Sequence, residues 1–136
     1  MQTATFKDLG RAACHALNVG DVAFDETVAT LMLDDAIVTL EFDEAIDDDC
    51  LCVHVQMPGT EKLTQNLDVL RSLLALNMLS GSKTNGVFAM HPGSGQPTYT
   101  VQLTDLDQFT STSLAEILRI LVAQGVGGIG ALRNLV

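Results

Sequence analysis

The chain has 136 residues, a length that suits one domain, and 47% of them are hydrophobic. Its net charge of −10 argues against binding nucleic acid or anionic lipid, because phosphate groups are bound largely by Lys and Arg. No apolar run approaches the roughly 20 residues of a membrane span. The N-terminus lacks the features of a secretory signal, and the three cysteines are an odd number. We therefore expect a cytoplasmic protein.

The first half of the chain predicts one helix followed by three strands. Apolar residues recur at helical spacing over residues 6–17, opposite charged ones. Apolar and polar residues then alternate over residues 28–33, 36–42 and 51–57. Three short consecutive strands of this kind favour an antiparallel meander.

Residues 67–79 predict a second helix that is too apolar for an ordinary surface position. Its apolar residues form two stripes: Leu67, Leu70, Leu74 and Met78 in the first, and Val69, Leu73, Leu76 and Leu79 in the second. A surface helix that covers one core needs a single stripe, so this helix is expected to be buried on two sides. We expect the first stripe to pack under the sheet and the second to contact another subunit.

The remainder predicts two strands and a closing helix. Residues 87–90 and 98–103 indicate a hairpin with a Gly- and Pro-containing connection. Ser113 and Glu116 fit a capping box, and a single apolar stripe follows from Leu114 to Val122. The order αβββαββα predicts an α+β fold, a twisted antiparallel sheet packed with three helices, in one domain spanning 1–136. The Gly-rich tail, 125–136, either folds back or stays mobile.

Several segments imitate cofactor or catalytic motifs without their structural context. Gly125, Gly127 and Gly130 match G-x-G-x-x-G but follow a helix instead of a strand. Residues 81–84, Gly-Ser-Lys-Thr, lack the glycine that precedes the lysine of a phosphate-binding loop. Residues 93–95 lack the spacing of a nucleophile elbow. We expect neither an enzyme nor a cofactor.

Two groups of possible metal ligands are also incomplete. Cys50, Cys52 and His54 alternate along one strand face, but a structural zinc site needs four ligands. The five carboxylates of residues 43–49 lack the Gly and Glu of a calcium-binding EF-hand loop. We interpret these groups as a weakly polar strand face and a solvated loop, and expect no bound metal.

The element order, the acidic composition and two short motifs together resemble class I type III secretion chaperones, the Tir chaperone family. The motifs are Leu-Leu-x-x-Asn at residues 73–77 and a Thr-Asn-Gly turn at 84–86 that leads into a strand. The resemblance covers residues from about 3 to 124, and the Gly-rich tail departs from the longer, polar closing helix common in the family. Asn77 lies in the apolar arc of its helix, so its amide is expected to bond to backbone or to a symmetry mate.

The resemblance implies a bacterial homodimer that binds the N-terminal chaperone-binding region of an effector, keeps it non-globular and assists its delivery to the secretion apparatus. It places the dimer contact on the second helix and the next strand: Val69, Leu73, Leu76, Leu79, Val87 and Ala89. It places effector binding, by apolar pockets and strand addition, near the first helix and outer strands: Phe6, Leu9, Ala13, Phe24, Val28, Thr30 and Met32. An ordinary core role is the competing interpretation for Phe6, Leu9 and Ala13.

Two other classes of function stay open. A regulatory protein that sequesters another cytoplasmic factor would use the same exposed apolar edge. An enzyme or small-ligand module would need a cleft with convergent polar groups. His15, His54 and His91 lie in three different predicted elements with no motif around them, which disfavours this second class.

Overall fold

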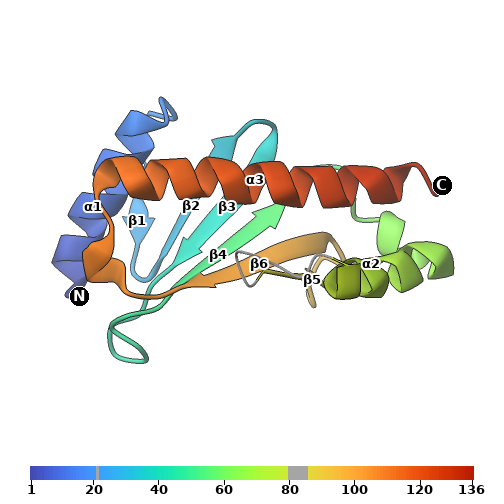
Figure 1. Ribbon diagram of the computed structural model, residues 1–136, viewed down its shortest axis with the longest axis horizontal. Helices are drawn as coiled ribbons and strands as arrows, with labels where there is room; N and C mark the ends of the chain where they lie inside the picture. The colour runs from blue at the N-terminus through green and yellow to red at the C-terminus, as the bar shows by residue number, and fades with distance from the viewer. Residues whose placement is uncertain (21, 80–85) are drawn as a thin grey trace.

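The computed structural model describes residues 1–20, 22–79 and 86–136, except for the side chain of Leu79. Within these residues, three helices pack with a six-stranded antiparallel sheet (Figure 1). The helices are α1 (Thr3–Ala16), α2 (Leu67–Leu79) and α3 (Ser111–Arg133). The strands are β1 (Phe24–Asp25), β2 (Val28–Leu33), β3 (Ala36–Glu41), β4 (Leu51–Gln56), β5 (Val87–Met90) and β6 (Pro97–Leu103). The predicted α+β class is confirmed, and β1 is an additional strand.

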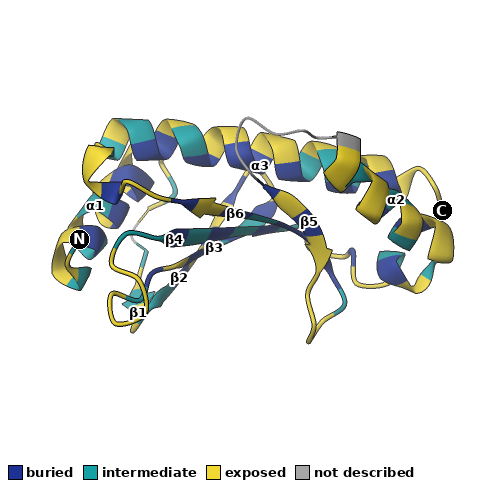
Figure 2. Cartoon of the chain, turned by 60° about the horizontal axis from the view of Figure 1, so that its bottom comes forward, coloured by how far each residue is buried: buried dark blue, intermediate teal, exposed yellow. Residues whose placement is uncertain are grey.

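The sheet has the strand order β1-β2-β3-β4-β6-β5, so β1 and β5 lie at its two edges. The predicted meander forms β2, β3 and β4, and β6 pairs with both β4 and β5. Helices α1 and α3 cover one face of the sheet, and α2 lies beside the β5 edge (Figure 2). Within the described residues, no helix covers the opposite face.

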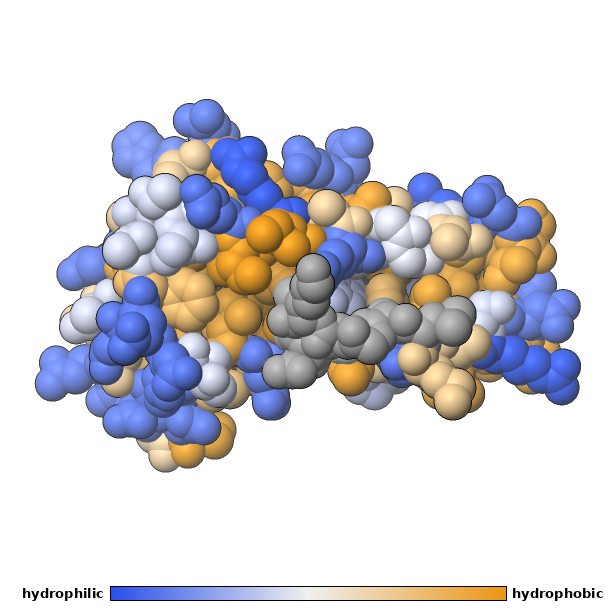
Figure 3. All heavy atoms as spheres, viewed as in Figure 1, coloured by the Kyte–Doolittle hydropathy of each residue, from blue (hydrophilic) through white to orange (hydrophobic). Residues whose placement is uncertain are grey.

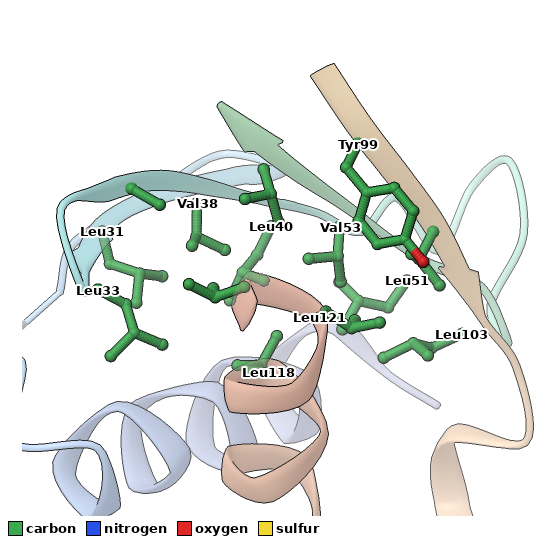
Figure 4. Close-up of a cluster of buried hydrophobic side chains, with 14 of the residues drawn as sticks. Leu31, Leu33, Val38, Leu40, Leu51, Val53, Tyr99, Leu103, Leu118 and Leu121 are labelled. Carbon is green, nitrogen blue, oxygen red and sulfur yellow. The ribbon is translucent and has the colours of Figure 1, made fainter. Parts of the chain in front are cut away.

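The core lies between the sheet and α3. Alternate strand residues such as Val38, Leu40 and Val53 are buried and point toward Leu118 and Leu121 of α3 (Figure 4). Each fully buried aliphatic side chain of this kind contributes about 1.5–3 kcal/mol relative to an exposed one. The period-two alternation of these strands is therefore the signal that fixes which face carries the helices.

The start of α3 differs from the predicted capping box. Thr110, not Ser113, is the N-cap: its Oγ1 accepts a hydrogen bond from the Ser113 N–H at 3.1 Å, and Ser113 Oγ accepts one from the Thr110 N–H at 2.9 Å. The chain is extended at Phe109 and Thr110 after the short 3₁₀ turn η2 (Leu106–Gln108), so the helix begins three residues earlier than expected. Glu116 is exposed on its surface.

The Gly-rich segment continues α3 as a helix to Arg133. Gly125 lets this helix approach the sheet, because a Cβ there would lie 2.9 Å from Val55 Cγ1, and Gly128 faces the ring of Phe88. By length and composition, α3 is the one described helix that could cross a membrane, and 39% of its most apolar window is buried. A core helix of a soluble protein passes the same test.

Candidate partner-binding surfaces

The β5 edge of the sheet is capped by a side chain of α2. Asn77 Nδ2 donates a hydrogen bond to the Phe88 carbonyl at 2.9 Å, and the Phe88 N–H donates to Asn77 Oδ1 at 2.6 Å. This confirms the backbone partner expected for Asn77. The amide takes the place that a neighbouring strand would occupy, so β5 is closed to strand addition at Phe88.

The opposite edge of the sheet is open along half of β2. Phe42 N–H donates to the Thr27 carbonyl at 2.9 Å, and bonded and non-bonded pairs alternate along an antiparallel ladder. Residues 29, 31 and 33 therefore bond to β3, while the backbone groups of Val28, Thr30 and Met32 point away from it. Strand β1 pairs only with Val28 and Ala29. Thr30 and Met32 thus have no strand partner on their outer side within the described chain.

A groove of about 500 Å³ runs along this open edge. One wall is the connection between α1 and β1, and the other is β2 itself. The lining residues, which define the β2-edge groove, are Val19, Val22, Ala23, Asp25, Val28, Thr30, Leu31 and Met32. Val19 and Val22 could not be predicted from the sequence, because they lie outside any periodic segment.

The seven residues assigned to effector binding divide into two groups. Phe6 and Ala13 are buried within the protein, which corrects their assignment: the Phe6 ring stacks on Phe42 at 4.5 Å and meets Phe24 edge-on at 5.7 Å. Their side chains are core residues and leave no surface for a partner. The others keep exposed surface: Leu9, Phe24 and Val28 are half-buried, while Thr30 and Met32 are exposed.

Gly10 allows the β1 edge of the sheet to pack against α1. A Cβ at this position would lie 2.5 Å from Phe24 Cζ, so only glycine lets the Phe24 ring pack directly on the helix. This contact places the two-residue strand β1 over α1. Such a short strand gives no periodic signal, which is why the sequence did not predict it.

The two stripes of α2 exist as predicted, but it is the second stripe, not the first, that packs against the rest of the chain. Val69 and Leu73 are 0% and 4% exposed and pack in the core of their own chain, whereas Leu74 and Met78 are 72% and 88% exposed. Asn77 follows Leu73 by one helical turn and must face β5, which turns the Val69 and Leu73 side inward. The dimer assignment of Val69 and Leu73 is corrected accordingly.

An exposed apolar surface remains on the outer side of α2 and β5. Of the residues assigned to a dimer contact, Val87 and Ala89 are exposed and Leu76 is half-buried, while the side chain of Leu79 lies outside the described residues. Apolar residues are visible at the right-hand end of the molecule, where α2 and the end of α3 lie (Figure 3). We define the α2 patch as Leu67, Leu74, Met78, Val87 and Met90, each at least 49% exposed.

The uncovered face of the sheet is polar and shallowly hollowed. His54 Nδ1 lies 3.0 Å from Thr100 Oγ1, and Gln56 Nε2 donates to Thr98 Oγ1 at 3.1 Å. These side chains line a hollow of about 390 Å³ that reaches Met90 and His91. No described group of three or more His, Cys, Asp or Glu side chains is placed to hold a metal. Burial and the adjacent Cys50 raise the pKa of Cys52 to about 11.

The acidic loop at 43–49 has structural contacts. Asp49 accepts hydrogen bonds from the N–H groups of Leu106 at 2.8 Å and Asp105 at 3.0 Å, and these bonds hold the pKa of its carboxyl below the usual value. Glu44 accepts bonds from the Thr3 hydroxyl and N–H, which lower its pKa in the same way. The loop therefore ties α1 and η2 to the end of the sheet.

Solved structures of protein complexes contain chains with this architecture. A chain of the ExsC–ExsE complex superposes with a TM-score of 0.69 at 18% identity, over 98% of this chain and 94% of that chain. The present chain has the same fold. A chain of the HopA1–SchA chaperone–effector complex gives a TM-score of 0.63 at 16% identity, over 96% and 98% of the two chains.

A third likeness is to a chain of the ExoT–SpcS complex from Pseudomonas aeruginosa. Its TM-score is 0.53 at 22% identity, over 85% of this chain and 93% of that chain. No protein-family model and no curated protein matches the sequence. The likeness in fold is therefore seen only by comparing structures, because the sequence identities of 16–22% are too low for the sequence comparisons to find a relative.

Proposed function

We propose that this protein is a cytoplasmic chaperone of a bacterial type III secretion system. It binds the N-terminal chaperone-binding region of an effector in extended form, keeps it non-globular and assists its delivery to the secretion apparatus. The open edge of β2 is the observation that carries the proposal. Thr30 and Met32 present unpaired backbone groups beside an apolar groove, which is the arrangement that strand addition requires.

The fold supports this proposal, since one structure with the same fold is described as a chaperone–effector complex. The capped β5 edge supports it further. Because Asn77 occupies the outer side of β5 at Phe88, the sheet directs an added strand to β2. An extended segment bound there would bury its apolar side chains against Val22, Val28 and Met32 while its backbone continues the sheet.

The second part of the proposal is a homodimer formed through the α2 patch. Leu74 and Met78 are more than two-thirds exposed in one chain, and water contact of such side chains is unfavourable by roughly 25 cal/mol per Å². The patch lies beside β5, whereas the β2-edge groove lies at the other edge of the sheet. A dimer would leave both grooves accessible.

Affinity capture from the native cytoplasm, followed by limited proteolysis of the complex, tests the function. We expect the wild-type chain to retain and protect an extended N-terminal segment of a secreted protein. Met32→Glu should abolish capture by placing a charge in the groove. Ile46→Glu is the matched control, because Ile46 is 84% exposed in the acidic loop and the change adds the same charge.

Two results would contradict the proposal. Equal capture by wild type and Met32→Glu would show that the groove is not the binding site. Capture of a cytoplasmic factor that is never secreted, through the same groove, would instead support a sequestering regulator.

A further inference from the structure

Carboxylates lie at both ends of strand β2, beside the β2-edge groove. Asp25 ends β1 and Glu26 lies in the turn between β1 and β2, while Asp34 and Asp35 form the turn after β2. All four residues are exposed. Strand β2 has six residues, so the two acidic ends are separated by roughly 20 Å, at about 3.4 Å per residue.

Within the described residues, none of these carboxylates is neutralised by an ion pair. The one ion pair there joins Arg11 and Asp8 at 3.7 Å. Arg11 also lies over the ring of Phe24, at 5.8 Å from its centroid. No Lys, Arg or His lines the groove. The groove is therefore lined mainly by apolar residues, with carboxylates beyond each end of β2.

From this arrangement, and resting on the proposed function, we infer the chemistry of the bound segment: an extended peptide of about six residues, apolar at alternate positions, with basic residues at both ends. The alternating positions follow from the pleat, which turns every second side chain toward the groove. The basic flanks follow from charge complementarity, which acts within a Debye length of about 8–10 Å of each end. Since both ends of β2 carry carboxylates, basic flanks are expected whether the added strand runs parallel or antiparallel to β2.

Synthetic fluorescent peptides test this inference on the full chain. The probe has a central Val-Ser-Val-Ser-Val-Ser segment with two Lys at each end, and its counterpart has two Glu at each end. We expect the Lys-flanked peptide to bind roughly tenfold more tightly at low salt, with the ratio approaching one near 1 M salt, where the Debye length is about 3 Å.

Two protein variants locate the charges responsible. The double variant Asp34→Asn, Asp35→Asn should reduce the ratio of the affinities for the Lys-flanked and Glu-flanked peptides. Asn suits these positions because both have positive φ, at 50° and 64°. Asp48→Asn with Asp107→Asn is the matched control, since it removes two exposed carboxylates beside the other end of the sheet. An unchanged ratio in the first variant would overturn the inference.

The remaining outcomes separate the inference from the proposed function. Equal binding of the Lys- and Glu-flanked peptides would overturn the charge rule and leave strand addition intact. Equal binding of a Lys-flanked peptide with N-methylated valine amides would contradict strand addition, and with it the proposed function. A failure of both parent peptides to bind would overturn the inference, because the probe contains every feature it names.

Discussion

The side chain of Asn77 pairs with the backbone of Phe88 through both of its amide atoms. One residue thereby fixes the rotation of α2 about its axis and closes the β5 edge of the sheet at Phe88. Phe88 is 6% exposed, so water could not readily replace Asn77 as the partner of its N–H and C=O groups.

Replacing Asn77 by Ala should lower the free energy of unfolding by about 1–3 kcal/mol, because two backbone groups of Phe88 are left without partners. Asn77→Asp should also destabilise the protein, since a carboxylate can accept from the Phe88 N–H but cannot donate to its carbonyl. Urea denaturation measures both. Asn134→Ala, at the exposed end of α3, is the control and should stay within about 0.5 kcal/mol of wild type.

Two glycines of α3 should respond to alanine with opposite sign. A Cβ at Gly127 meets nothing within 4 Å, so Gly127→Ala should stabilise the protein by about 1 kcal/mol through helix propensity. A Cβ at Gly125 would lie 3.1 Å from Val55 Cβ and 3.2 Å from Tyr99 Cβ. Gly125→Ala should therefore destabilise by about 1–3 kcal/mol through overpacking. Equal effects in thermal or urea unfolding would refute the close packing of α3 on the sheet.

Substitutions of the adjacent residues Leu73 and Leu74 should have different effects, one on folding and the other on dimerisation. Leu74→Glu should give a folded monomer, because Leu74 is exposed on the α2 patch. Leu73→Glu should unfold the chain, because it would place an unpaired charge in the core. Circular dichroism and sedimentation velocity distinguish the two. A folded Leu73→Glu monomer, or a Leu74→Glu chain that still dimerises, would show that the faces are assigned wrongly.

Acid should remove the stabilisation that Asp49 provides. The hydrogen bonds from Leu106 and Asp105 lower its pKa in the folded chain, so its contribution is present above the unfolded value of about 3.9 and is lost as pH falls through the folded value. The stability difference between wild type and Asp49→Asn should thus shrink as pH falls toward 2. Urea denaturation at several pH values measures this difference. Asp107→Asn controls for charge removal, and a difference independent of pH would contradict the assignment.

The sequence predicted the elements better than their orientation. Alternation located β2, β3 and β4 almost to the residue, because one face of each strand is buried and the other is not. In α2 both stripes are apolar, so periodicity could not tell which one faces the sheet. Asn77 carried the missing information: its spacing of four from Leu73 assigns it to the inward side.

The β2-edge groove was predicted only in part. Thr30 and Met32 were among the residues that the family resemblance assigned to effector binding, and both are exposed. Val19 and Val22 come from a connection without regular structure, and their place beside β2 depends on the contact between Phe24 and Gly10. Long-range contacts of this kind leave no local pattern in the chain.

The most direct test of strand addition is amide hydrogen exchange of β2 in the free chain and in the complex with a captured segment. We predict that the amides of Thr30 and Met32 exchange rapidly in the free chain and slowly in the complex, since an added strand would accept their hydrogen bonds. Ala29 and Leu31 already face β3 and serve as internal references. Unchanged exchange at Thr30 and Met32 in a saturated complex would contradict the account.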